Sequence, residues 1–363
     1  MKNKKLIISV FFHAQHGGLH EYVVASIEAA LRDGWSVGIV CRDGEFISER
    51  IRGLNVEKMA INFEDGAECQ RAIEYLSTAD LIHTHPGKSR EIALQASRIS
   101  KAPVVMTLHG RWTDAVYSYY DELSCIICVS EAVADIVKNY NIINLAEKLV
   151  VIPNGVILND YSELENLVGY STFGQKKRTI NVISRFDSDK RFLVDLVKSL
   201  MQEQILRKNY LLNWRFLGDG AIVGEIEAQA KLVTSSCPDV SVEFLGWIQQ
   251  DDLLKELSLS DVCIASGRGA MQSLAFGKPT IAAASVGYAL VTKPEDLLKA
   301  AYSNFGGVGA TIEYSVSLVF DQLVAAAFHP HQGFPLSAST FVKENYEQFE
   351  VDRKLLSIYK SLL

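Results

Sequence analysis

Short apolar runs alternate with helix-like segments along the chain, and this alternation limits the possible folds more than any other feature. The runs in the first half are Leu6–Phe12, Val37–Cys41, Leu81–His83, Val104–Leu108, Cys125–Val129 and Leu149–Ile152. The second half repeats the pattern with Ile180–Ile183, Trp214–Leu217, Val240–Leu245, Val262–Ala265 and Thr280–Ala284. Strands that alternate with helices form a parallel sheet with helices on both faces. The sequence therefore predicts an α/β protein of two doubly wound domains.

A polar stretch without clear periodicity, from Asp160 to Arg178, separates the two halves. We expect a first domain over residues 1–165, a second over 166–340, and a closing segment over 341–363. One amphipathic helix is predicted for the closing segment, because its apolar side chains recur on one helical face. These side chains are Val342, Tyr346, Phe349, Leu356, Tyr359 and Leu363.

The composition indicates a packed globular protein, with 363 residues of which 48% are hydrophobic and 22% charged. A formal net charge of -7 argues against nucleic acid as the main partner, because phosphate backbones require a basic surface. A local basic patch would still allow peripheral association with an anionic membrane. No apolar run reaches the roughly 18 residues of a membrane span. The six scattered cysteines suit reduced core thiols in the cytoplasm.

A glycine-rich turn lies between the runs Val262–Ala265 and Thr280–Ala284, within the segment Ser266–Pro279. Glycines before a short helix leave backbone N–H groups available at the helix N-terminus, where they can hold a phosphate. This segment is therefore a candidate phosphate-binding loop.

Two cations lie just past the first apolar run of the second half. Arg185 and Lys190 are five residues apart, which suits a diphosphate because arginine makes forked contacts and lysine acts as a point charge. Asp187 and Asp189 form an Asp-x-Asp pair in the same loop, a pattern that can hold Mg²⁺ or Mn²⁺. Because the pair is interleaved with cations that can neutralise phosphates directly, we predict that no metal ion or other cofactor is required.

Candidate ligand-binding residues also follow strands in the first half. Gly17 and Gly18 come after the first run and would let the backbone approach a ligand closely. His109 follows the run Val104–Leu108 beside a glycine, where it would face a binding cleft. Six histidines lie in this half, at His13, His16, His20, His83, His85 and His109. The spacing of the first three suggests zinc, but no cysteine or carboxylate cluster completes a ligand set, so we predict no metal site.

Taken in order, these motifs resemble the retaining GT-B glycosyltransferases, including glycosyltransferase family 4 (glycosyl transferases group 1). The resemblance covers nearly the whole chain, and the order and spacing of the motifs are more specific than any one of them. The motifs are Gly17-Gly18, Thr107-Leu108-His109-Gly110, Val129-Ser130-Glu131, Ile152-Pro153-Asn154-Gly155-Val156, Ser184-Arg185-Phe186 with Lys190, Phe216-Leu217-Gly218-Asp219-Gly220, Phe244-Leu245-Gly246-Trp247, and Gly267 to Pro279. The resemblance implies two Rossmann-like domains that face a central cleft, with a C-terminal helix that crosses back to the first domain.

The resemblance also implies roles by position. Arg185 and Lys190 would hold the donor diphosphate and stabilise its charge as it leaves. His109 and the Gly17-Gly18 loop would lie near the transferred sugar. The remaining donor-binding residues would be Gly246 and Trp247 at the base, Gln272 at the ribose hydroxyls, and the loop residues Arg268, Gly269, Ala270 and Met271.

The chain departs from the family pattern at two positions in this loop region. Gln272 stands where the family usually has a glutamate, and Ile264 stands where it has another. A glutamine offers one acceptor oxygen and an amide donor to the ribose, where a carboxylate would accept from both hydroxyls. We expect this difference to weaken donor binding by roughly tenfold and not to abolish it.

The function implied by the resemblance is that of a retaining glycosyltransferase of the hexosyltransferase type. It would move a sugar from a nucleotide-diphosphate donor to a glycan or glycolipid acceptor held by the first domain, in the synthesis of bacterial lipopolysaccharide, capsule or a related glycoconjugate. Two alternatives stay open. A GT-B-like sugar-nucleotide epimerase or hydrolase would need a pair of acid/base carboxylates, which the motifs do not show. The second alternative is a protein that binds a sugar nucleotide without turnover, and Gln272 and Ile264 are the residues that support it.

Overall fold

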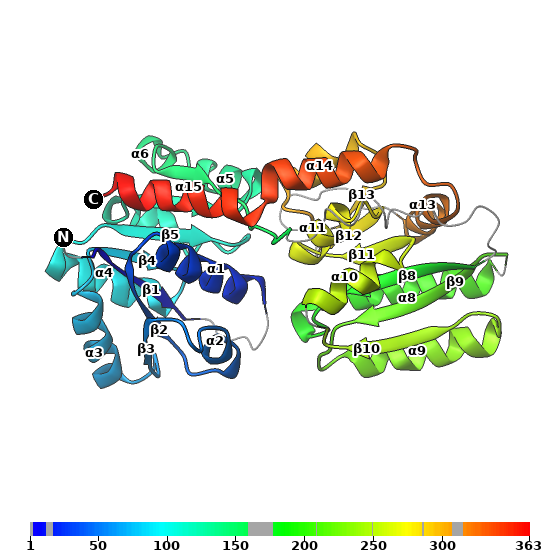
Figure 1. The fold of residues 1–363 in the computed structure, drawn as a ribbon, viewed down its shortest axis with the longest axis horizontal. Coiled ribbons are helices and arrows are strands. Elements are labelled where there is room, and N and C mark those ends of the chain that lie inside the picture. The colour runs from blue at the N-terminus through cyan, green and yellow to red at the C-terminus, as the bar shows by residue number, and fades with distance from the viewer. Residues whose placement is uncertain are drawn as a thin grey trace. The chain divides into compact units, whose positions relative to one another are not determined.

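The computed structural model describes residues 3–11, 17–158, 177–207, 209–248, 250–284, 287–306 and 315–363. The chain divides into two compact units (Figure 1). The first comprises Met1–Gly155 and Gln348–Leu363, and the second comprises Val156–Glu347. The predicted boundary at residues 165 and 166 lies outside the described residues, as does most of the polar stretch around it.

The first unit is built on a sheet with the strand order β3-β2-β1-β4-β5-β6-β7, in which every neighbouring pair is parallel. The strands are β1 (Lys5–Val10), β2 (Ser36–Cys41), β3 (Val56–Ala60), β4 (Leu81–Thr84), β5 (Val104–Leu108), β6 (Cys125–Cys128) and β7 (Leu149–Val151). The order reverses between β1 and β4, which makes the sheet doubly wound. Strands β4, β5 and β6 are buried throughout, because a parallel sheet is covered on both faces.

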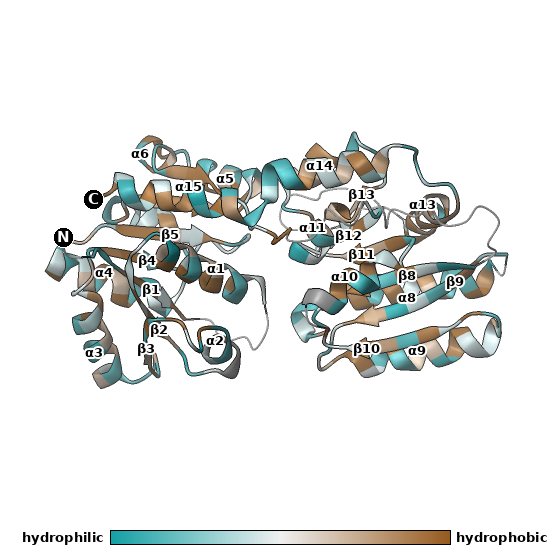
Figure 2. Cartoon of the chain, in the orientation of Figure 1, coloured by the Kyte–Doolittle hydropathy of each residue, from teal (hydrophilic) through white to brown (hydrophobic). Residues whose placement is uncertain are grey.

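Helices cover both faces of this sheet (Figure 1). They are α1 (Gly18–Arg32), α2 (Glu45–Arg50), α3 (Gly66–Leu76), α4 (Lys88–Ser100), α5 (Glu131–Lys138), α6 (Ile143–Ala146) and α15 (Gln348–Ser361). Figure 2 shows the central strands as mostly hydrophobic and the helices as mixed, with polar residues on parts of their surface. Among the described residues, no helix is long and apolar enough to span a membrane.

The second unit repeats the architecture with the strand order β10-β9-β8-β11-β12-β13. Its strands are β8 (Lys177–Ile183), β9 (Leu211–Leu217), β10 (Val242–Gly246), β11 (Val262–Ala265), β12 (Thr280–Ala284) and β13 (Gly287–Val291). Its helices are α8 (Arg191–Leu206), α9 (Val223–Ser236), α10 (Gln250–Ser258), α11 (Arg268–Ala275), α12 (Asp296–Tyr302), α13 (Val316–Phe328) and α14 (Phe334–Tyr346). Two doubly wound units, as the alternating pattern predicted, are therefore confirmed.

Two edge strands, β3 and β13, were not among the predicted strands, although each predicted apolar run overlaps a strand. Glu57 and Lys58 lie exposed in the middle of β3, and most of β13 is only half-buried. Strand β13 also pairs antiparallel with β12, unlike the rest of the sheet. An edge strand borders solvent and does not need an unbroken apolar run, so the hydrophobic pattern that found the central strands missed both.

The segment 341–363 is two helices, so the prediction of one continuous amphipathic helix was wrong. Helix α14 ends at Tyr346 in the second unit, and Glu347 breaks the helix with an extended ψ of 130°. Helix α15 then packs on the first unit, with Val351, Leu355 and Tyr359 in the core. The predicted return of the C-terminal helix to the first domain is confirmed.

Polar contacts fix α15 on the first unit. The buried carboxylate of Asp352 accepts hydrogen bonds from Arg32 of α1 at 2.6 Å and from Gln348 at 2.7 Å. Tyr359 is fully buried, and its hydroxyl lies 2.6 Å from Nδ1 of His83 on β4. A buried polar group that loses its partner keeps the cost of desolvation, so this contact should matter to stability.

We predict that Tyr359→Phe lowers the free energy of unfolding by about 1–3 kcal/mol, because it leaves Nδ1 of His83 buried without a hydrogen bond. Phe349→Ala, at an exposed position of the same helix, should change it by less than about 0.5 kcal/mol. Urea unfolding followed by circular dichroism measures both. Equal effects in the two variants would show that the Tyr359–His83 contact does not hold the helix.

Candidate functional site

The loop after β8 holds two cations against one carboxylate. Arg185 contacts Asp187 through Nε at 3.2 Å and Oδ2 of Asp189 through Nη2 at 2.7 Å. Nζ of Lys190 lies 3.5 Å from the same Asp189 oxygen. The side chains of Arg185 and Lys190 are 24% and 31% exposed, whereas that of Asp189 is 52% exposed. The two cations therefore share an anion that lies on the solvent side and can be exchanged for another.

The loop after β9 packs on this cationic loop through two glycines. A Cβ at Gly218, where φ is 132°, would lie 1.8 Å from the carbonyl oxygen of Ser184. A Cβ at Gly220, where φ is 155°, would lie 2.4 Å from Phe186 backbone atoms. Phe186 N–H donates to the Asp219 carbonyl at 2.9 Å. The glycines let two strand-end loops touch, and this contact fixes the backbone that carries Arg185.

The glycine-rich loop brings the start of α11 to the same edge of the sheet. Gly267 precedes the helix with φ 54°, and its N–H donates to the Phe305 carbonyl at 2.7 Å. A Cβ at Gly269 would lie 3.4 Å from Ile183 and 3.5 Å from Ala265, the last residues of β8 and β11. The first turn of α11 therefore lies against the strand ends, beside the loop that holds Arg185.

The side chains of this helix divide between core and surface. Ala270 and Met271 are fully buried, so they can meet a ligand only through the backbone, and the N–H of Met271 already donates to Gly267. Arg268, Gly269 and Gln272 are partly exposed. The helix N-terminus thus offers backbone amides and partial positive charge at the strand edge.

The loop after β10 adds an aromatic side chain at this edge. The Gly246 carbonyl accepts a hydrogen bond from Gly218 N–H at 2.7 Å, and Trp247 is half exposed. Because the strands are ordered β10-β9-β8-β11, the predicted residues Trp247, Arg185 and Gly269 follow one another along one sheet edge. The second unit thus gathers the donor-side residues that the sequence pointed to.

In the first unit, a cluster of histidines lies at the carboxyl ends of β4 and β5. Nδ1 of His85 lies 2.9 Å from Nε2 of His109. His83 bonds through Nε2 to the Thr107 hydroxyl at 2.8 Å. The Tyr22 ring meets the His109 ring edge-on, with centroids 5.1 Å apart. The sequence singled out His109 but not its partner His85, because no local pattern shows that neighbouring parallel strands place these two residues side by side.

Burial keeps these imidazoles neutral. It lowers the pKa of His83 and of His109 to about 3, and the pKa of His85 falls well below its usual value for the same reason. Neighbouring histidines add to each shift, since a second positive charge in the cluster would be repelled. At neutral pH His109 therefore acts as a hydrogen-bonding group without charge.

The glycine pair of the first unit sits at the start of α1. Gly17 precedes the helix, and its carbonyl accepts from Glu21 N–H at 3.1 Å. A Cβ at Gly18 would meet nothing within 4 Å of the described atoms. Packing of the described residues therefore does not demand a glycine at Gly18, and its role as a point of close approach stays a prediction.

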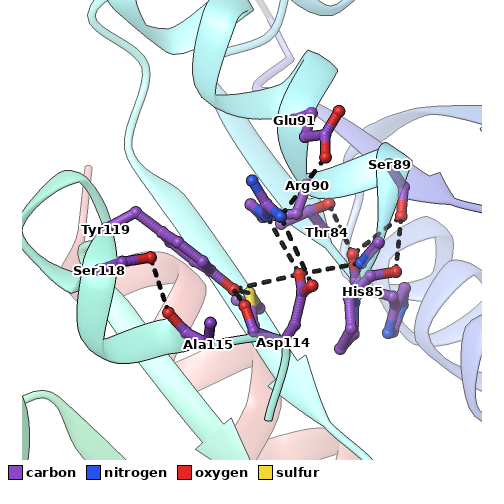
Figure 3. A network of polar contacts seen from close by, with 12 residues as sticks. Thr84, His85, Ser89, Arg90, Glu91, Asp114, Ala115, Ser118 and Tyr119 are labelled. Carbon is purple, nitrogen blue, oxygen red and sulfur yellow. Dashed lines mark hydrogen bonds and ion pairs between the residues drawn. The ribbon is translucent and has the colours of Figure 1, made fainter. Parts of the chain in front are cut away.

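A buried carboxylate that the sequence did not single out joins the loops after β4 and β5 (Figure 3). Asp114 Oδ2 accepts from Gly87 N–H at 2.9 Å, from Arg90 Nε at 3.0 Å and from the Tyr119 hydroxyl at 3.1 Å. The guanidinium of Arg90 also lies over the Tyr119 ring, 4.4 Å from its centroid. An aspartate six residues after a strand carries no sequence signal for such contacts.

The Asp114 loop has a strained backbone. Asp114 and the next residue, Ala115, both lie in the left-handed region, with φ 53° and 51°. This conformation costs roughly 1–2 kcal/mol per non-glycine residue. Charge-assisted hydrogen bonds to Asp114 contribute about 1.5–3 kcal/mol each, which is enough to offset the strain.

Among the described residues, no three His, Cys, Asp or Glu side chains are arranged to hold a metal ion. His13 and His16, two of the three histidines whose spacing suggested zinc, lie outside the described residues. The Asp187 and Asp189 carboxylates are described, and both contact Arg185.

Comparison with known sequences finds a family match in the first part of the chain. Residues 16–160 match the family model described as Glycosyltransferase Family 4. A phosphatidyl-myo-inositol mannosyltransferase of Mycobacterium leprae (strain TN) is 23% identical over 196 residues, which make up 46% of this chain and 50% of that protein. The match therefore spans half the length of this curated relative.

Comparison with solved structures covers the whole chain. A glycosyltransferase from Rickettsia africae ESF-5 superposes with a TM-score of 0.70 at 17% identity, over 100% of this chain and 99% of that one. The Anabaena protein Alr3699/HepE, solved in complex with UDP, gives a TM-score of 0.68 at 16% identity, over 99% of this chain and 100% of that one. The chain has the GT-B fold, and the resemblance inferred from the motifs is confirmed.

We predict that acidification destabilises the first unit through its neutral histidines. In the unfolded chain His83 and His109 each take up a proton as the pH falls below 6.5, whereas in the fold neither does until the pH nears 3. Each buried ring should therefore cost up to about 1.4 kcal/mol per pH unit over that window. Stability lost on acidification returns when the pH is raised.

Urea unfolding between pH 8 and pH 4.5 measures this dependence. His109→Gln removes one titrating ring and should make the loss of stability with falling pH shallower. His329→Gln, at an exposed position of the second unit, is the matched control and should leave the slope unchanged. A wild-type slope in His109→Gln would contradict the burial of a neutral ring at that position.

Proposed function

We propose that this chain, a GT-B protein whose first unit carries the Glycosyltransferase Family 4 signature, is a glycosyltransferase. It takes a sugar from a nucleotide-diphosphate donor and transfers it to an acceptor. The proposal includes retention of the anomeric configuration, a hexosyl group as the sugar, and a glycan or glycolipid of the bacterial surface as the acceptor.

The observation that carries the proposal is the convergence of Arg185 and Lys190 on one exchangeable carboxylate. A carboxylate and a phosphate present similar anionic oxygens, so the Asp189 position marks where a diphosphate oxygen would bind. The first turn of α11 adds backbone amides at the same sheet edge. The similar Anabaena structure was solved with UDP, which supports a nucleoside diphosphate as the ligand of this edge.

The remaining assignments follow the order of the strands. Trp247 and Gly246, after β10, are assigned to the nucleobase, and Gln272 on α11 to the ribose. Arg268, Gly269, Ala270 and Met271 form the loop at the diphosphate and sugar, the last two through the backbone. In the first unit, Gly17, Gly18 and His109 are assigned to the transferred sugar, and the unit itself to the acceptor.

Electrostatic stabilisation of the leaving group is the main catalytic effect in this proposal. As the bond between the sugar and the diphosphate breaks, negative charge grows on the diphosphate oxygens. Once the diphosphate has displaced Asp189, Arg185 and Lys190 are in place to stabilise this charge. His109 is neutral, so it can hold a sugar hydroxyl by a hydrogen bond but does not supply a positive charge. Positioning by His109 and charge stabilisation by the cations are thus separate tasks.

The first test is donor turnover with and without acceptor extract. Thermal-shift screening against nucleoside diphosphates and their sugars selects the donor, because a ligand that binds only the folded state raises its stability. Donor consumption that requires acceptor supports transfer. Consumption without acceptor would favour a hydrolase or epimerase, and binding without consumption would favour a protein that has lost turnover.

We predict that Arg185→Ala and Lys190→Ala each weaken binding of the nucleoside diphosphate by roughly tenfold to a hundredfold, because each removes a charge-assisted contact of about 1.5–3 kcal/mol. Arg191→Ala is the matched control, since Arg191 begins α8 in the same region but pairs with Asp195 and Glu225. Isothermal titration calorimetry with the nucleoside diphosphate measures the affinity of each variant. Wild-type affinity in Arg185→Ala and Lys190→Ala would remove these residues from the donor site.

We also predict that Asp189→Asn tightens donor binding, by up to about tenfold, because a donor diphosphate must displace Asp189 from Arg185 and Lys190. Asp195→Asn, an equally exposed carboxylate on α8, should change little. If the Asp187–Asp189 pair instead held Mg²⁺ or Mn²⁺, Asp189→Asn would weaken binding and chelation by EDTA would do the same to the wild type. Calorimetry with and without EDTA separates the two accounts.

A further inference from the structure

Two contacts join the same pair of loops in the first unit. The turn after β4, residues 85–87, meets the loop after β5, residues 109–115, through His85 and His109 at 2.9 Å. It meets that loop again through Gly87 N–H and Asp114 Oδ2, also at 2.9 Å. The histidine contact lies at the start of the β5 loop and the carboxylate contact near its end. The loop is therefore held at both ends against one turn.

Asp114 accepts further hydrogen bonds besides the one from Gly87 N–H that joins the two loops. Its carboxylate also accepts hydrogen bonds from two nitrogens of Arg90, at 3.0 and 3.4 Å, and from the Tyr119 hydroxyl. Only 9% of the Asp114 side chain and 18% of the Arg90 side chain are exposed. The carboxylate also lies at the N-terminus of α4, where the helix dipole favours a negative charge. Figure 3 shows Asp114 between Tyr119 and the turn that carries His85.

The backbone conformation indicates that this arrangement is needed. Asp114 and Ala115 stay in the left-handed region although a glycine at either position would relieve the strain. Strained backbone of this kind persists where the surroundings fix it, and it clusters at functional sites. At Asp114 a glycine would also remove the carboxylate that joins the two loops.

We propose that Asp114 is a positioning residue that holds His109 in place for sugar transfer. Its carboxylate locks the β5 loop onto the turn at Gly87 and Arg90, and this lock keeps His85 and His109 in hydrogen-bonding register. Because each neutral imidazole carries one N–H, the shared contact requires that only one of His85 Nδ1 and His109 Nε2 carries a proton, so the tautomers of the two rings are coupled. Asp114 does not touch the substrate itself. The kinetic part of this inference rests on the proposed function.

The kinetic test compares Asp114→Asn with Glu122→Gln. Both changes remove the charge from a carboxylate paired with two arginine nitrogens in the first unit, but the Glu122 side chain accepts its hydrogen bonds from Arg98 and not from the turn at residues 85–87 or the loop at residues 109–115. We expect Asp114→Asn to lower kcat about tenfold to a hundredfold, as misplacement of a positioned group does. Its KM for the donor should change less than kcat, since the residues proposed to bind the diphosphate and the nucleobase, Arg185, Lys190 and Trp247, lie in the second unit. Glu122→Gln should keep both constants.

A second variant separates positioning from folding. Asp114→Gly relieves the left-handed strain but lacks the carboxylate, so it should stay folded and lose kcat as Asp114→Asn does. Ala115→Gly relieves the neighbouring strain and keeps the carboxylate, so its kcat should stay at the wild-type level. Wild-type kcat in a folded Asp114→Gly would overturn the proposal.

A spectroscopic test does not depend on any transfer reaction. In protein labelled at histidine, the imidazole nitrogen shifts of His85 and His109 report their tautomers and their shared hydrogen bond. We expect both to change in Asp114→Asn and to stay unchanged in Glu122→Gln. Unchanged shifts in Asp114→Asn would refute the positioning role even if the protein transfers sugars. A wild type without transfer would refute the proposed function and leave this test valid.

Discussion

Parallel pairing of buried strands is the constraint on which the rest of the structure depends. The strand hydrogen bonds use up the backbone polar groups of β1, β4, β5 and β6, and helices close both faces, so most of their side chains are apolar and a polar side chain inside needs a partner, as His83 has in Thr107. Polar chemistry is displaced to the loops beyond the strand ends. Arg185 and His109 both lie there, two residues beyond β8 and directly beyond β5.

In each unit the candidate residues lie at the carboxyl ends of the sheet strands, but the two sites differ in charge. The second unit places Arg185, Lys190 and a helix N-terminus together, and these positive groups suit a multiply charged anion. The first unit keeps His83, His85 and His109 neutral, with the pKa of His109 lowered to about 3. A neutral imidazole can hold a hydroxyl group and would add no attraction for a second diphosphate. The difference fits a charged donor on one unit and a largely neutral sugar or acceptor on the other.

How far the sequence predicts this structure depends on whether a feature is local. Central strands contain short apolar runs, and Arg185 lies two residues after one of them, so both could be predicted. Edge strands such as β3 lack an apolar run. The end of helix α14 before Glu347 could not be predicted either, because α14 belongs to the second unit and α15 to the first. The contacts of His85 with His109 and of Arg90 with Asp114 join residues 24 positions apart. Only the strand order brings such residues together, and no spacing rule reveals them.

Positive φ angles occur both at glycines and at Asp114, and the two cases differ in what the side chain contributes. At Gly218 and Gly220 only a left-handed backbone and close packing are required, and glycine supplies both at little cost. At Asp114 a positive φ of 53° is adopted by a residue with a side chain, which costs strain. The carboxylate offsets that cost through Gly87, Arg90 and Tyr119, and it gives the loop a fixed attachment that glycine could not. The carboxylate at Asp114 therefore fixes the loop that begins at His109 onto the turn at Gly87, whereas the glycines at Gly218 and Gly220 only allow two loops to pack.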